Sequence, residues 1–364
     1  MILSDYLDAY AARYAPYKAG RWCYEDGCIY WGLHLLAEAT GDPRWNAHLL
    51  RLIGPQVAGD GRLRDYTAEE FNIDNILAGR VLLPLGRLTG DPRFMAAAGH
   101  LAAQLGHHPR IPAGNYWHKQ RYPHQVWLDG LYMGLPFQIE YALATGDSAR
   151  ITDALLQFAT ALALTVAPGG LHVHGYDDSR LQSWADARTG KSAAVWARAM
   201  GWLVMALVDA LGGLPPDAAT ASLRGQTRAI LLALAERQGA SGLWPQVLDQ
   251  PQLAGNYDES SASAMFAYAF LRAARLGLVA GAEASRLRAA GLRALTALSA
   301  RVTPGAGLTG ICHVAGLGPF SGRERDGSPG YYLTEDVVSD DAKGVGPLMM
   351  AVAESVLAGA DGAG

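Results

Sequence analysis

Apolar residues recur at spacings of three and four along most of the chain, which is the pattern of amphipathic helices. Leu155, Phe158, Ala159 and Leu162, for example, fall on one face of such a helix. Alternation typical of strands is short and scattered, as in residues 171–176. The pattern therefore predicts an all-α chain. We expect helices near residues 3–17, 28–40, 43–53, 74–88, 91–106, 127–144, 147–166, 192–212, 217–238, 258–276, 281–301 and 344–359.

A short turn motif recurs between predicted helices. Residues 40–45 read TGDPRW, residues 89–94 read TGDPRF, and residues 145–150 read TGDSAR. Glycine suits the left-handed end of one helix, aspartate can cap the next helix, and proline fits its first turn. The copies lie about 50 residues apart, which is room for one helical hairpin with its loops.

Twelve helices in six hairpins predict a closed double ring, an (α/α)6 barrel, and an open solenoid is the alternative. The hairpins are unequal, and the loops at 107–126, 167–191 and 302–343 are long and rich in aromatic residues. Such loops are where functional sites tend to lie, and they favour the closed ring. No Ser/Pro-rich linker divides the chain, so we expect a single domain over residues 1–364.

Composition narrows the class of protein. Half of the 364 residues are hydrophobic, which is enough for a large core. The net charge is −4 and there is no basic run, so nucleic acid is not an expected partner. No apolar run reaches membrane-spanning length, and the first residues lack the basic and apolar regions of a signal peptide. With only three cysteines, these features predict a cytoplasmic protein without a disulfide framework or a membrane partner.

Residues 113–137 place aromatic, cationic and imidazole side chains around one carboxylate, Asp129. This combination suits an anionic ligand with an apolar face, such as a sugar acid. Aromatic walls would raise the pKa of Asp129, whereas a helix N-terminus would lower it, and the sequence leaves that balance open. The alternative is a capping acid beside core aromatics. The aromatic residues expected around Asp129 are Tyr116, Trp117, Tyr122, Trp127, Tyr132 and Phe137.

Two further stretches could supply partners for Asp129. Asp74 stands in a stretch rich in apolar residues. It is either a second functional carboxylate or the N-cap of the helix that follows. His172 and His174 are two apart and would share a face in an extended segment. Since no third ligand stands at a diagnostic spacing, we expect no metal site and a single ligand-contacting histidine, His174.

Residues 192–205 begin a strongly apolar helix that contains an arginine. Arg198 and Trp202 are four apart and therefore neighbours on one face. An arginine against a tryptophan plane makes a binding surface for a carboxylated sugar. Trp196 points elsewhere unless it lies in an irregular first turn. The alternative is a core tryptophan pair with a surface arginine, but an unpaired arginine in such a run is costly.

Several long motifs, in the same order along the chain, resemble family 105 of the glycoside hydrolases, the unsaturated rhamnogalacturonyl hydrolases. The resemblance covers nearly the whole chain. It rests on RWCYEDG (21–27), NIDNILAGR (72–80), YWHK (116–119), YPHQVWLDGLYMGLPF (122–137), HGYDDSR (174–180), VWARAMGW (195–202), NYDESSASAMFAYA (256–269) and YYLTEDVVSDDAKGVGP (331–347).

The resemblance implies an (α/α)6 barrel that removes a 4,5-unsaturated galacturonyl unit from the non-reducing end of a small oligosaccharide. Such enzymes hydrate the vinyl ether, and the resulting hemiketal opens and releases the neighbouring sugar, usually rhamnose. The family's acid/base aspartate falls on Asp129, which would protonate C4 and then deprotonate the water that attacks C5. Its second aspartate falls on Asp74, which would orient the substrate or Asp129. No metal or organic cofactor is implied.

By the same resemblance, a set of aromatic, cationic and histidine side chains lines the sugar subsite, with Lys119 and Arg198 as the candidate partners of the uronate. Where relatives carry an aromatic before the histidine, this chain has Val173, which bears on fine specificity. The alternatives are an unsaturated glucuronyl hydrolase of glycosaminoglycan fragments, an inverting glycosidase that uses Asp74 and Asp129, and a carbohydrate-binding toroid without activity. The expected subsite residues are Tyr24, Lys119, His174, Trp196, Arg198 and Trp202.

Overall fold

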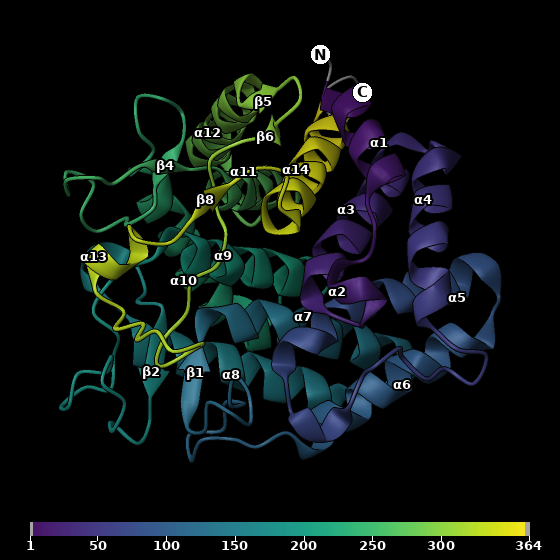
Figure 1. Cartoon of the computed structure of the whole chain (residues 1–364), viewed down its shortest axis with the longest axis horizontal. Coiled ribbons are helices and arrows are strands. Elements are labelled where there is room, and N and C mark those ends of the chain that lie inside the picture. Colours follow the sequence, from purple (N-terminus) through teal and green to yellow (C-terminus); the bar gives the residue numbers. More distant parts are fainter. Residues whose placement is uncertain (1–2, 361–364) are drawn as a thin grey trace.

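The computed structural model describes residues 3–360, and helices dominate them (Figure 1). The predicted all-α class is confirmed. The helical elements are α1 (Leu3–Arg13), α2 (Tyr17–Gly20), α3 (Tyr24–Thr40), α4 (Pro43–Ile53), the 3₁₀ segments η1 (Gly54–Gln56), η2 (Ala68–Glu70) and η3 (Ile73–Val81), α5 (Leu82–Thr89), α6 (Pro92–His107), α7 (Leu128–Thr145), α8 (Ser148–Thr165), η4 (Pro168–Gly170), α9 (Ala197–Gly212), α10 (Ala218–Ala235), α11 (Ser260–Arg275), α12 (Gly281–Ala300), α13 (Pro329–Tyr332) and α14 (Ala342–Ala360).

Six inner elements form a closed ring. They contact one another in the order α3, η3 with α5, α7, α9, α11 and α14, and α14 packs back against α3. Figure 1 shows this closure where the last helix lies beside the first part of the chain. The outer layer consists of α4, α6, α8, α10 and α12, each packed on its inner neighbour, while α1 packs on α14. The ring therefore closes as an (α/α)6 barrel, and the open solenoid is excluded.

The repeated turn motif forms inner-to-outer connections as predicted. Asp42 caps α4 by accepting a hydrogen bond from the Arg44 amide at 2.9 Å, and the preceding Gly41 has a φ of +66°. Asp91 caps α6 in the same way. Since left-handed backbone favours glycine and a carboxylate satisfies free helix amides, each copy ends one helix and starts the next.

Burial differs between the two layers. Every residue from Ala197 to Leu211 in the inner helix α9 is buried. The outer helix α8 buries only one stripe, which includes Phe158 and Leu162. Ala159, expected on that stripe, is exposed, because the stripe advances through Ala154, Phe158 and Ala161. Inner helices thus need apolar residues all round, and outer helices need only one apolar face.

The predicted single helix over residues 74–88 is wrong in its first half. Residues 73–81 wind as the 3₁₀ segment η3, and the α-helix α5 begins only at Leu82. Asn75, Gly79 and Val81 are weak helix formers. A Cβ on Gly79 would stand 2.2 Å from the Leu101 side chain, so glycine permits the close packing of this segment on α6.

A chain of buried charges crosses the middle of the ring. The Arg80 guanidinium lies 3.8 Å from the centre of the Trp31 ring. Arg80 and Arg272 share the carboxylate of Asp209 at 2.7 and 3.0 Å. Because buried charges need partners, these pairs hold the inner elements in a fixed arrangement. From α3 round to α14, the participants are Trp31, Arg80, Glu140, Asp209, Arg272 and Glu354.

Short antiparallel strand pairs lie in the loops at one end of the ring. The predicted strand-like run at 171–176 contributes only its last residues. No helix within residues 3–360 is long and apolar enough to span a membrane. The pairs are β1 (Gln125–Trp127) with β2 (Gly175–Asp177), β3 (Trp244–Pro245) with β4 (Asp258–Glu259), β5 (Val302–Thr303) with β6 (Gly307–Leu308), and β7 (Ile311–Cys312) with β8 (Val337–Val338).

Candidate active site

Each inner element brings a polar side chain from its first two residues to the same end of the ring. A cavity of about 270 Å³ lies there, and all of these residues except Ser261 line it. The N-termini of several helices therefore surround the cavity, and their partial positive charges favour an anionic ligand. In ring order the residues are Tyr24 (α3), Asp74 (η3), Asp129 (α7), Arg198 (α9), Ser261 (α11) and Lys343 (α14).

Asp129 is placed by the strand pair β1–β2. The strand β1 runs directly into α7, and the Leu128 amide donates to the His174 carbonyl at 3.0 Å. This puts Asp129 Oδ2 3.0 Å from His174 Nε2, and neither atom has a hydrogen-bond partner elsewhere in residues 3–360. Oδ2 is buried while the side chain as a whole is 15% exposed. The other oxygen, Oδ1, is therefore the one that faces the cavity.

His174 is fully buried behind Asp129. Its Nδ1 lies 2.7 Å from the Tyr332 hydroxyl, so both ring nitrogens have a neighbour. The Tyr332 ring in turn stacks on Trp196 at 5.5 Å between centroids. His174 does not line the cavity, in contrast to its expected contact with the ligand. Its effect on chemistry must pass through Asp129.

The pKa of Asp129 is lowered. Burial is the largest single influence and raises it, but His174 and His118 together lower it by more. The aromatic walls considered from the sequence are thus outweighed by a histidine that comes from a different hairpin. Asp129 therefore rests as a carboxylate near neutral pH.

Asp74 forms an ion pair instead of capping a helix. Asn72 caps η3 by accepting from the Asp74 amide at 3.2 Å. The Asp74 carboxylate contacts Lys119 Nζ and lies 3.6 Å from His118 Nε2. Burial raises the pKa of Asp74, but Lys119 and His118 lower it by more, so the net change is downward. Lys119 is consequently engaged with Asp74.

Arg198 is a buried cation held by carbonyl groups. Its guanidinium donates to the Cys312 carbonyl, to the His313 carbonyl at 3.5 Å and to Ser261 Oγ at 3.4 Å. No carboxylate within residues 3–360 lies in ion-pair distance of it, and its Nε lacks a partner. Because a buried charge requires compensation, Arg198 is a candidate anion-binding side chain of the cavity.

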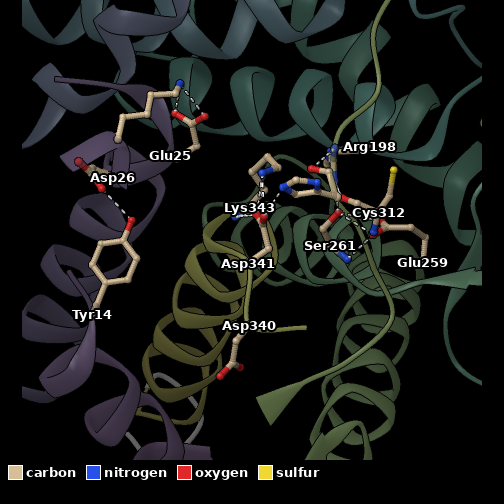
Figure 2. A network of polar contacts seen from close by, with 12 residues as sticks. Tyr14, Glu25, Asp26, Arg198, Glu259, Ser261, Cys312, Asp340, Asp341 and Lys343 are labelled. Carbon is tan, nitrogen blue, oxygen red and sulfur yellow. Dashed lines mark hydrogen bonds and ion pairs between the residues drawn. The ribbon is translucent and has the colours of Figure 1, made fainter. Parts of the chain in front are cut away.

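Figure 2 shows how this arginine is supported: Arg198 turns toward Ser261 and Cys312, with Glu259 beside them. The Glu259 carboxylate accepts from the Ser261 hydroxyl at 2.8 Å and from the Cys312 amide at 2.9 Å. Glu259 thereby fixes the loop whose carbonyl receives Arg198. In the same view Lys343 lies beside Asp341, and the two are 2.8 Å apart.

Tryptophans form the apolar part of the cavity. Trp196 is extended at the start of α9, with φ −77° and ψ 128°, and this irregular start lets it line the cavity together with Trp202. The Arg198 guanidinium lies 4.8 Å from the centre of the Trp196 ring. Trp127 stacks on His118 at 4.2 Å between centroids on another wall.

The aromatic cage expected around Asp129 is only partly present. Tyr122 and Trp127 line the cavity, as do the expected residues Tyr24, Asp74, Lys119, Trp196, Arg198 and Trp202. Tyr132 and Phe137 are fully buried deeper in the ring, because α7 carries them away from its first turn. Tyr116 packs in the core, and Trp117 packs against it.

Sequence reasoning missed several residues of the site. Arg325 lines the cavity and comes from the long loop 302–343, which its length had marked as a candidate. Lys343, which lines the cavity, and Tyr332, which lies behind it, belong to the recognised motif 331–347. Lys18 and Glu25 pair at 2.9 Å on another wall. Their signal in the sequence is weak, because exposed lysines and helix-start glutamates are common.

The two histidines of the run 171–176 do not act together. His172 Nδ1 lies 3.0 Å from Thr165 Oγ1, whereas His174 faces Asp129. Within the part of the chain that the structure describes, no group of three His, Cys, Asp or Glu side chains is placed to hold a metal ion.

Comparison with known proteins places the chain in a family. The sequence model of Glycosyl Hydrolase Family 88 matches residues 7–358. A solved glycoside hydrolase from family 105 of C. acetobutylicum ATCC 824 is 36% identical, with a TM-score of 0.86 over 92% of this chain and 93% of that one. Unsaturated glucuronyl hydrolase from Bacillus sp. GL1 shares the fold, with a TM-score of 0.68 over 98% and 95% of the two chains at 16% identity.

Two relatives differ in how similar they are to this chain and in whether their names state an activity. Protein Atu3128 of Agrobacterium fabrum is 64% identical over 230 residues, which are 62% of this chain and 99% of that protein. Unsaturated rhamnogalacturonyl hydrolase YesR of Bacillus subtilis is 27% identical over 263 residues, which are 70% of this chain and 72% of that protein. With the family match, the barrel and the cavity at its end, the chain belongs to the glycoside hydrolase families 88 and 105, the unsaturated uronyl hydrolases.

Proposed function

We propose that the enzyme removes the 4,5-unsaturated galacturonyl residue from the non-reducing end of rhamnogalacturonan or pectin-lyase oligosaccharides. The observation that carries the proposal is the pairing of Arg198, a buried cation without a carboxylate partner, with Asp129 in one small cavity. A uronate carboxylate satisfies the first group, and the carbon–carbon double bond next to it comes within reach of the second. The similarity to YesR supports galacturonan-derived substrates.

The reaction is an addition of water to a vinyl ether. A proton is added to C4 and the oxygen of water to C5, which gives a hemiketal at C5. The hemiketal opens by breaking the bond between C5 and the ring oxygen and leaves a ketone at C5. The former ring oxygen then forms the carbonyl at C1 as the C1–aglycone bond breaks. Asp129 can serve both proton transfers in turn, as acid toward C4 and as base toward water.

Because the pKa of Asp129 is lowered, the residue must gain a proton before it can act as an acid. The substrate itself favours this protonation, because a uronate anion bound close to a carboxylate disfavours the charged form of that carboxylate. Substrate binding therefore raises the pKa of Asp129 and loads it with the proton that C4 receives. After the transfer, the carboxylate beside His174 is again a base that can activate water.

Other cavity residues bind and orient the sugar. Arg198 takes the uronate carboxylate, since Lys119 is already engaged with Asp74. The Asp74–Lys119 pair presents a fixed acceptor and donor to sugar hydroxyls. Trp202 and Trp196 cover the apolar face of the ring and exclude water from it.

An inverting glycosidase is the weaker alternative, because it needs two carboxyl groups that act together, one protonated and one ionised. In this site Lys119 and His118 hold the Asp74 carboxylate and lower its pKa, which makes Asp74 a weak general base for water. Hydration by a single acid/base residue fits that arrangement.

The test is loss of the ultraviolet absorbance of the unsaturated uronyl group from pectin-lyase products. The wild-type enzyme should remove it, and Asp129→Asn should lower kcat by about 10²–10⁴-fold while its circular dichroism spectrum stays unchanged. Saturated galacturonides and unsaturated glycosaminoglycan disaccharides run in parallel. Equal turnover of saturated substrates would establish the inverting glycosidase instead, and a preference for glycosaminoglycan products would establish a glucuronyl hydrolase.

A further inference from the structure

A second cavity of about 450 Å³ adjoins the active-site cavity. The two are continuous, because the same side chains form the boundary between them. Beyond the boundary, the second cavity is lined by Arg21, Asn72, Asn75 and Gln120 among others. We call this second cavity the outer cleft. The residues shared by both cavities are Lys18, Tyr24, Asp74, Lys119 and Arg121.

The volumes of the two cavities suit different parts of an oligosaccharide: the active-site cavity suits the unsaturated sugar, and the outer cleft suits the aglycone. Pockets for drug-sized ligands begin at about 300 Å³, and the active-site cavity, at about 270 Å³, is smaller than that. It therefore has room for the unsaturated sugar and little more. The side of the cavity beside Asp74 and Lys119 gives a longer aglycone a way out, and the outer cleft begins there.

The outer cleft is positive although the protein is negative. Four cationic side chains line it against two carboxylates, while the whole chain has a net charge of −4. A local charge opposite to that of the molecule concentrates and orients anionic ligands. The cations are Lys18, Arg21, Lys119 and Arg121, and the carboxylates are Glu70 and Asp74.

Arg121 is the cation available to a ligand. Arg21 is paired with Glu70 at 2.7 Å, and Lys119 contacts Asp74. Within residues 3–360 no carboxylate lies in ion-pair distance of Arg121. Its guanidinium lies 4.9 Å from the centre of the Tyr122 ring and 5.2 Å from that of the Phe320 ring. A guanidinium positioned by stacking keeps its fork of donors free for a carboxylate.

Asn75 adds a neutral contact. The residue is only 6% exposed, and its backbone carbonyl accepts from Trp22 Nε1 at 2.8 Å. Its side-chain amide lines the outer cleft and has no hydrogen-bond partner among the described residues. An amide offers both donors and an acceptor, which suits sugar hydroxyl groups.

We propose that the outer cleft is an aglycone subsite in which Arg121 binds a second carboxylate, so that the preferred substrates are acidic oligosaccharides. These carry one further uronate beyond the sugar released next to the unsaturated unit. The inference rests on the proposed function and extends it from the reacting sugar to the rest of the substrate.

The experiment compares three substrates that share one unsaturated uronate at the non-reducing end. The first is a disaccharide, the second is an oligosaccharide with a second uronate, and the third is the same oligosaccharide with the second carboxyl group reduced to an alcohol. The wild-type enzyme should show a kcat/KM about tenfold higher for the acidic oligosaccharide than for the reduced one. The difference should shrink as salt is added, because the Arg121 site is open to solvent.

Arg121→Gln should abolish the difference in kcat/KM between the acidic and the reduced oligosaccharide, and Arg121→Lys should restore part of it. Because the readout is a ratio between two substrates, any effect of the change on the reacting sugar cancels. The matched control is Arg62→Gln, because the Arg62 side chain is 78% exposed, pairs with Asp60 and lines neither cavity. Turnover of the disaccharide with no preference between the two oligosaccharides would overturn the subsite and leave the proposed function standing. Failure to turn over any unsaturated substrate would overturn both.

Discussion

His174 Nε2 stands 3.0 Å from Asp129 Oδ2, so the carboxylate that lines the cavity is supported by a histidine that does not. The histidine is itself held by the Tyr332 hydroxyl, 2.7 Å from its other ring nitrogen. The pKa of Tyr332 is raised well above its usual value by burial, so its hydroxyl keeps its proton. The three residues form one line from the core to the active-site cavity.

Tyr332→Phe should lower kcat about tenfold and leave KM nearly unchanged. The phenylalanine keeps the stacking on Trp196 but removes the hydroxyl that orients His174. Since Tyr332 does not line the cavity, binding should be unaffected. The measurement is the pH profile of kcat, which should change shape because the partner of Asp129 has lost its own hydrogen bond.

Tyr331→Phe is the matched control for this change, because the Tyr331 hydroxyl accepts from the Gly316 amide and does not contact His174. Its pH profile should match that of the wild type. If the pH profile of Tyr332→Phe coincides with that of the wild type, Tyr332 does not act on Asp129 through His174.

Arg198→Gln should reduce kcat/KM by about 10- to 100-fold, mainly through KM, because the uronate carboxylate loses its charged partner. A direct binding readout separates this from damage to the fold. Galacturonate should raise the Tm of the wild-type protein and not that of the variant. Stabilisation of both proteins to the same extent would show that the anion binds elsewhere.

The free energy of unfolding should fall as the pH drops below about 6.5. Burial lowers the pKa of four histidines, so each is neutral in the folded protein but protonated in the unfolded chain. The unfolded state thus binds more protons between pH 6.5 and the folded pKa values, and stability is lost over that window as the pH falls. The values are about 4 for His34, His108 and His172, and about 3 for His118.

The measurement is Tm by circular dichroism from pH 7.5 down to 4.5. His34→Gln is the informative variant, because His34 packs at a tilt against Trp31 outside the active-site cavity. The number of protons taken up on unfolding, which sets the slope of the unfolding free energy against pH, should fall by about one. A slope identical to that of the wild type would show that His34 is protonated in the folded state.

Asp209→Asn should destabilise the protein by about 3–5 kcal/mol, because it leaves Arg80 and Arg272 without their shared carboxylate in the core. The change removes charge but almost no volume, so packing loss cannot account for the effect. Urea denaturation gives the free energy of unfolding directly. The exposed pair of Asp60 and Arg62 provides a control, since Asp60→Asn should leave the denaturation midpoint unchanged. An equally small effect at Asp209 would show that the buried pairs are not needed to hold the ring.

The sequence by itself determined most of the helices, the capped turns and several of the residues at the helix starts. These depend on contacts within a few positions along the chain: the Asp42 carboxylate meets an amide two residues away, and helical periodicity repeats every three or four residues. Asp129 and Asp74 could be singled out for the same reason, as carboxylates in unusual local company. Counting hairpins predicted the closed ring but left the open solenoid as an alternative, which only the contact between α14 and α3 excluded.

Only the tertiary structure decided what each carboxylate contacts and therefore its pKa. His174 lies far along the chain from Tyr332, 158 residues away, and Arg80 is 129 residues from Asp209. Local sequence carries no record of such pairings, and electrostatic effects act through space across whichever groups the ring brings together. Asn72 took the capping role that Asp74 could have filled, and the outer cleft exists only because segments from separate hairpins meet.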